Sequence, residues 1–284
     1  MHLGIVIFPT DTTLDPVRLA REVEARGFES LWFPEHSHIP VRRTTPWGGR
    51  EGAAPLPEKY WRTHDAFTAF GAAAMVTERL RLGTAITLVA QRDPVWLAKQ
   101  VATVDRLSGG RFEFGVGFGW NREEMATHGT DPGTRFRRVA ESIDLMTAIW
   151  TEEVAAYDGE IVSLEPSWSW PKPVQAPRPP VHVGTGTGPK GLDVVFDHAD
   201  GWMPFGRRFD ESMATFRAEA DRRGVDPTDW VITAYGVRPE PAALEAIAAE
   251  GAHRALFDVD SLPPDEVLAE LDRLTEVKAL YEGG

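Results

Sequence analysis

The residues best suited to chemistry in this chain are a carboxylate and a histidine that stand side by side in Pro34-Glu-His-Ser-His38. Histidine is the side chain most easily tuned for proton transfer near neutral pH, and Glu35 adds a second titratable group beside His36. We therefore expect His36, with Glu35, to act as a catalytic acid or base. A packed, hydrogen-bonded histidine is the structural alternative, and His36 with His38 is also the spacing of a metal-binding pair.

A second stretch has the composition of a surface for a flat ligand. From Phe112 to Gly117, large apolar residues alternate with Glu113 and two glycines, which is the period of a strand. A further glycine follows at 119, and then come Trp120 and Asn121. Because glycine allows another molecule to approach the backbone closely, this strand end predicts a shelf for a ligand with polar edges. A tight turn without a ligand is the alternative.

A third stretch, Gly184-Thr-Gly-Thr-Gly188, directly precedes a predicted helix. The backbone amides of such a loop and the helix N-terminus form a site for an anion. A flexible linker is the alternative.

These three stretches need regular elements to position them, and the chain alternates strand and helix almost throughout. Strands are expected at 3–8, 30–33, 80–88, from 111 onward, and at 180–183, 201–203, 230–237 and 254–258. Helices are expected at 15–26, 65–78, 94–107, 136–150, 190–198, 211–223, 242–250 and 264–281. This order predicts a single-domain (β/α)8 TIM barrel over residues 1–284, in which function lies at the carboxyl ends of the strands. Insertions are expected after the second strand (34–62) and before the fifth (152–180), and a doubly wound open sheet is the competing fold.

Composition narrows the range of partners. The formal net charge is −13, which disfavours nucleic acid and anionic membrane surfaces as partners. The chain has no cysteine, so it has no disulfide, thiolate metal site or cysteine nucleophile. The apolar run from Leu3 to Phe8 is too short for a signal peptide or a membrane span. We expect a cytoplasmic protein that acts on a small molecule.

Taken together and in order, the strand-end motifs resemble those of the luciferase-like oxidoreductases, in particular their actinobacterial branch that depends on coenzyme F420. The similarity covers about the first 205 residues well and the remainder in outline. The motifs are Leu31-Trp-Phe-Pro-Glu-His36, Leu82-Gly-Thr-Ala-Ile-Thr87, Arg106-Leu-Ser-Gly-Gly-Arg-Phe112, Gly115-Val-Gly-Phe-Gly-Trp-Asn121, Pro180-Val-His-Val-Gly-Thr-Gly186 and Asp200-Gly-Trp202.

The resemblance implies that the cofactor ring lies against the ends of the second, third and fourth strands. Glu35 and His36 are then expected at its polar edge, with His36 moving the proton that accompanies hydride transfer. A cis peptide is implied at Ala85-Ile86, below the ring. The remaining implied cofactor contacts are Thr84, Thr87, Gly117, Gly119, Trp120 and Asn121, with Gly184, Thr185 and Gly186 at the phosphate. A homodimer is also implied.

Departures from the family point to the substrate. The sugar-phosphate dehydrogenases of this family have a carboxylate where this chain has Trp120, and usually an aspartate in place of Glu35. Aromatic residues such as Trp47, Trp61 and Trp168 are frequent in the expected loops. We therefore expect an apolar or aromatic substrate. An FMN-dependent monooxygenase is the alternative, and a metal-dependent amidohydrolase-type barrel and a non-catalytic flavin-binding barrel are more remote ones.

Overall fold

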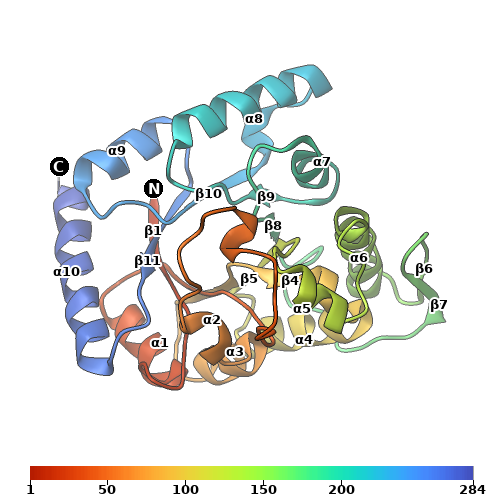
Figure 1. Ribbon diagram of the computed structural model, residues 1–284, viewed down its shortest axis with the longest axis horizontal. Coiled ribbons are helices and arrows are strands. Elements are labelled where there is room, and N and C mark those ends of the chain that lie inside the picture. The colour runs from red at the N-terminus through yellow and green to blue at the C-terminus, as the bar shows by residue number, and fades with distance from the viewer. Residues whose placement is uncertain (284) are drawn as a thin grey trace.

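The computed structural model describes residues 1–283, and its parallel strands close into a barrel of eight strands surrounded by helices (Figure 1). The predicted (β/α)8 TIM barrel is confirmed. Around the ring the order is β1, β2, β3, β5, β8, β9, β10 and β11, and β11 pairs with β1 to close it. The barrel strands are β1 (His2–Ile7), β2 (Ser30–Phe33), β3 (Arg81–Thr84) with its continuation β4 (Thr87–Leu88), β5 (Phe112–Gly117), β8 (Val181–Val183), β9 (Gly201–Trp202), β10 (Val231–Tyr235) and β11 (Arg254–Val259).

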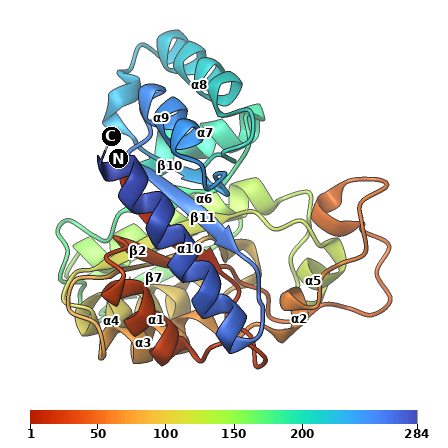
Figure 2. The same ribbon diagram turned by 90° about the vertical axis from the view of Figure 1, so that its left-hand side faces the viewer.

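Helices cover the outside of the barrel, and the last of them, α10, runs along it (Figure 2). The long helices are α1 (Pro16–Ala25), α3 (Ala66–Ala74), α4 (Pro94–Leu107), α6 (Arg135–Thr151), α7 (Pro189–His198), α8 (Phe209–Arg223), α9 (Pro241–Ala249) and α10 (Pro264–Gly283). The short ones are η1 (Trp47–Gly49), α2 (Lys59–Arg62), η2 (Val89–Gln91), α5 (Arg122–Thr127) and η3 (Pro227–Asp229).

The end of α3 differs from the prediction. The helix was expected to reach Glu78 but ends at Ala74. The Arg111 guanidinium donates to the carbonyl oxygens of Ala74 and Thr77, and Glu24 accepts from the amide of Glu78. These side chains satisfy backbone groups that a continuing helix would have paired internally, so the chain leaves the helix early.

The third strand was predicted as one piece over 80–88 and is in fact interrupted. The Ala85–Ile86 peptide is cis, as the resemblance implied, and separates β3 from β4. Pairing with β5 resumes at Thr87, which lies opposite Val116.

The insertion before the fifth strand is more regular than expected. It contains an antiparallel hairpin of β6 (Ala155–Asp158) and β7 (Ser163–Ser167). The Glu141 carboxylate on α6 accepts from the amides of Ile161 and Val162 and so ties the turn to the barrel. A side chain distant in sequence stabilises this turn, which is why local composition did not indicate it.

Candidate active site at the barrel mouth

His36 follows β2 and lies at the carboxyl end of the barrel. Its side chain is only 5% exposed, and its Nδ1 lies 2.7 Å from Oε2 of Glu124. The indole N–H of Trp120 donates to Nε2 at 3.3 Å. Because Nε2 accepts, the ring proton in this arrangement is on Nδ1 and is donated to Glu124. The Nε2 lone pair is therefore directed at the Trp120 indole.

Glu124 is the residue of this site that the sequence did not identify. It lies on α5, is fully buried, and also accepts from the amide of Ser37 at 3.2 Å. Asn121 caps the same helix by accepting from the Glu124 amide. An acidic residue in a first helical turn is usually explained by the helix dipole. The spacing from Asn121 to Glu124 is typical of a helix start, but it does not indicate a carboxylate that orients His36.

Glu35 points away from His36, as successive residues of an extended segment do. Its carboxylate accepts from Nε of Arg92 at 2.5 Å and from the amide of Leu88 at 3.3 Å. Burial raises the pKa of Glu35, and the Arg92 guanidinium opposes this effect. The structure thus pairs Glu35 with Arg92 behind the strand ends, and its contact with a cofactor stays a prediction.

Aromatic side chains gather over His36. The Tyr60 ring lies 5.2 Å from the His36 ring and 6.2 Å from that of Trp120, measured between centroids. Trp47 lies 5.8 Å from Tyr60 on its other side. The segment that carries Trp47 and Tyr60 extends beside α5 (Figure 2), where Glu123 accepts from the amide and hydroxyl of Thr44. Of the aromatic residues expected to cover the mouth, Trp47 lies here and Tyr60 joins it, whereas Trp61 and Trp168 are exposed.

Three buried polar atoms near the ends of β4 and β5 have no hydrogen-bond partner within residues 1–283. They are Oγ1 of Thr87, Nε2 of Gln91 and Nδ2 of Asn121. A buried polar group without a partner is costly, so each is suited to a polar ligand atom. Thr87 and Asn121 were predicted and Gln91 was not. Thr84, also predicted, donates instead to the carbonyl of Gly115 at 2.6 Å and thus belongs to the barrel wall.

The glycine shelf needs correction. A Cβ added at Gly117 or at Gly184 would meet the Ile86 side chain at 2.5 Å. These glycines therefore make room for Ile86, and Ile86, rather than bare backbone, fills the space there. Ala85 is buried beside it with Met203 and Leu256. Gly119 has a positive φ of 73° and serves the turn that leads to Trp120.

The loop before α7 is open. A Cβ at Gly186 would meet nothing within 4 Å, and the N-cap residue Gly188 provides no side-chain hydrogen bond to the helix. The Thr185 carbonyl accepts from the Trp202 indole at 2.9 Å, which anchors the loop to β9. The first amides of α7 are thus free of a side-chain cap, which suits the predicted anion site.

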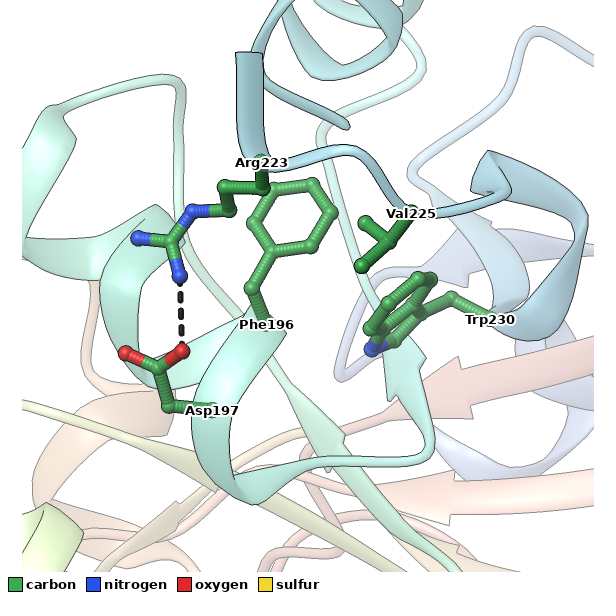
Figure 3. Close-up of a pocket in the computed structure, with 5 residues that line it drawn as sticks. All are labelled: Phe196, Asp197, Arg223, Val225 and Trp230. Carbon is green, nitrogen blue, oxygen red and sulfur yellow. Dashed lines mark hydrogen bonds and ion pairs between the residues drawn. The ribbon is translucent and has the colours of Figure 1, made fainter. Parts of the chain in front are cut away.

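A hollow of about 320 Å³ lies beside the mouth, between the segment around Trp47 and Lys59 and the residues that follow β11. Another, of about 290 Å³, lies outside the barrel between α7 and α8 (Figure 3). In that second hollow Arg223 pairs with Asp197 at 2.6 Å, next to Phe196 and Trp230. It contains none of the predicted site residues.

Within residues 1–283, no group of three or more histidine, aspartate or glutamate side chains is arranged to hold a metal ion. In the same range, no helix combines the length and the apolarity that crossing a bilayer requires.

Comparison with known proteins gives consistent matches. The family model described as luciferase-like monooxygenase matches residues 8–278. An uncharacterized protein of Mycobacterium tuberculosis is 41% identical over 280 residues, which cover 96% of this chain and 97% of that one. The F420-dependent glucose-6-phosphate dehydrogenase of Kineococcus radiotolerans is 30% identical over 187 residues, which cover 65% of this chain and 50% of that one. The crystal structure of the monooxygenase RslO1 from Streptomyces bottropensis superimposes with a TM-score of 0.78 at 19% identity, covering 99% and 100% of the two chains.

Proposed function

The chain belongs to the luciferase-like monooxygenase family, and from this premise we propose that it is an oxidoreductase that uses coenzyme F420 for hydride transfer to or from a small apolar or aromatic substrate. The observation that carries the proposal is the arrangement of His36 at the barrel mouth, with Glu124 on Nδ1 and the Trp120 indole on Nε2. The relative that depends on F420 supports the choice of cofactor.

The residues present at the mouth fit such a cofactor. The unpartnered atoms of Thr87, Gln91 and Asn121 would meet polar atoms of the ring and its side chain. Ala85 and Ile86 would form an apolar floor, and the loop before α7 would hold the phosphate. When bound, F420 supplies or accepts the hydride, and the protein binds and orients it and handles the proton.

His36 is the proton carrier in this proposal. When the substrate is oxidised, its hydroxyl group replaces the Trp120 indole N–H at Nε2 of His36 and gives its proton to that nitrogen. The buried Glu124 carboxylate stabilises the imidazolium that results. When the substrate is reduced, the same imidazolium returns the proton. Tyr60 and Trp120, packed over His36, would limit the access of water to this transfer.

An FMN-dependent monooxygenase is the second candidate, because the family model is described as a luciferase-like monooxygenase and a relative from Pseudomonas putida is named an FMNH2-dependent monooxygenase. We also propose a cytoplasmic homodimer. Trp96 on α4 is 70% exposed, and Trp168 and Trp170 after β7 are 79% and 60% exposed, so these side chains offer apolar surface for a second copy. Light scattering in solution distinguishes monomer from dimer.

The cofactor is tested by titrating the protein with F420 and with FMN and following the quenching of their fluorescence. We expect tighter binding of F420, and preferential binding of FMN would reverse the assignment. Thr87→Val should weaken F420 binding by about tenfold, because a hydroxyl partner of the ligand is lost. Ser142→Ala is the matched control, since it removes another unpartnered buried hydroxyl, on α6, and should leave the affinity unchanged.

A further inference from the structure

Asp258 lies on the inner face of the barrel at the carboxyl end of β11. Along this strand Arg254 and Leu256 face the interior, whereas Ala255 and Phe257 pack in the outer core. Asp258 continues the inner series, and it pairs in register with Val6 of β1, which also faces inward. Its side chain is exposed, which places a carboxylate at the barrel mouth on the side of β1, β10 and β11.

Asp258 has no partner among residues 1–283, where its side chain makes no hydrogen bond and no ion pair. Lys59 is nevertheless near enough for its charge to act on the carboxylate. Lys59 is bound instead to Asp260, with Nζ 3.1 Å from Oδ1. Asp258 keeps exposed surface, and its partial burial raises its pKa; the charge of Lys59 opposes this shift and that of Asp260 reinforces it. A carboxylate in this position can accept a hydrogen bond from a ligand that carries a donor group.

The walls around Asp258 are aromatic. Tyr235 of β10 faces the interior, and its ring lies 5.7 Å from that of Phe205. The ring of Tyr60 lies 4.8 Å from that of Phe8, just beyond β1. Burial raises the pKa of both tyrosines, and the charge of Asp258 acts in the same direction, so both phenols stay protonated near neutral pH. Tyr60 also contacts His36, and so it links the Asp258 side of the mouth to the proton carrier.

We propose that Asp258 anchors the substrate, and that the substrate is an apolar or aromatic molecule carrying a hydroxyl or ammonium group that donates to this carboxylate. The body of the molecule packs among Phe8, Tyr60 and Tyr235, and its reacting end extends toward His36. Carboxylate and phosphate substrates are disfavoured at this point by the negative charge. The assignment as a substrate rests on the proposed function, whereas the preference of the site for a donor group does not.

The test uses matched aromatic probes on the purified full chain, with and without F420. Dissociation constants for 2-naphthalenemethanol, 2-naphthylmethylamine, 2-naphthoate and 2-methylnaphthalene are measured by saturation-transfer NMR. We expect the alcohol to bind about tenfold more tightly than the methyl compound, because it adds a hydrogen bond to a charged group. The amine should bind more tightly than the carboxylate, and this difference should be larger than the one between the alcohol and the methyl compound.

The matched variants are Asp258→Asn and Asp260→Asn, which change the net charge equally at the same end of the barrel. The donor preference should fall to within twofold in Asp258→Asn and persist in Asp260→Asn. Equal loss in both variants, no preference in the wild type, or no binding of any probe would overturn the inference. Failure of F420 binding with the donor preference intact would instead overturn the proposed function and leave this site standing.

Discussion

At the amino ends of the strands, Glu113 accepts from His182 and Arg81 at 2.5 Å and from Arg254 at 3.3 Å, while Arg254 also pairs with Glu29 at 2.7 Å. At the carboxyl ends of the same strands, Asp258 and three buried polar atoms have no partner within residues 1–283. We call the first of these regions the lower layer and the second the mouth. In the lower layer, the Nδ1 of His182 is the exception to full pairing.

The difference separates stability from function within one barrel. Burial alone would raise the pKa of Glu113, but His182, Arg254 and Arg81 outweigh it and hold the pKa well below its usual range. These charges therefore satisfy one another within the fold. At the mouth, by contrast, Asp258 and the three buried polar atoms have no partner within residues 1–283, so a ligand can provide one. Changes in the lower layer should then alter folding, and changes at the mouth should alter binding and turnover.

The largest effect should come from the mouth. His36→Ala should lower turnover by about 10²- to 10⁴-fold, because the proton carrier is lost. Glu124→Gln should lower it by about tenfold, because the imidazolium loses its carboxylate. In His36→Ala, F420 affinity should fall far less than turnover, and the thermal stability should also fall, because the buried Glu124 loses its partner. His38→Ala is the control, since that ring contacts neither Glu124 nor Trp120 and its loss should leave turnover intact. Unchanged turnover in His36→Ala would remove the residue from its catalytic role.

The next largest effect should come from substitutions in the lower layer, which should lower the free energy of unfolding. Glu113→Gln should lower it by about 3 kcal/mol, because Arg81 and Arg254 lose a buried anionic partner. Denaturant titration measures this change, and the F420 affinity should remain as in the wild type. A large loss of cofactor affinity with unchanged stability would contradict the division between the two regions.

The same variant tests the pH dependence. The folded-state pKa of Glu113 is lowered, so its contribution is fully present above the unfolded value, about 4.3, and is lost as pH falls toward the folded value. The wild type should therefore lose more stability than Glu113→Gln between neutral pH and pH 3.

The smallest effects should come from a residue between the lower layer and the mouth, and they should concern both the free energy of unfolding and F420 binding. Gly117→Ala places a Cβ against Ile86 and should lower the free energy of unfolding by about 1–3 kcal/mol. It should also weaken F420 binding, because Ile86 is displaced from the floor of the mouth. Gly186→Ala has open space at its Cβ and should lower the stability by no more than about 0.5 kcal/mol. Equal effects in the two variants would show that Ile86 does not fill the space at Gly117.

Much of the fold could be predicted because strand and helix periods are local properties of a chain. The eight strands and the positions of His36, Trp120 and Asn121 at strand ends followed from alternation and from glycine and proline boundaries. The break at Ala85–Ile86 was implied by resemblance, and no local pattern indicates it. The β6–β7 hairpin was missed because Glu141, from a preceding helix, organises its turn.

The order of residues along the chain by itself determined that these elements form a barrel and that its chemistry lies at one end. Tertiary structure alone decided which neighbour each titratable group received: Glu124 for His36, Arg92 for Glu35 and, among residues 1–283, none for Asp258. The physical reason is that periodicity acts over a few residues, whereas the partner of a side chain is set by which distant segments the closed sheet brings within hydrogen-bond distance.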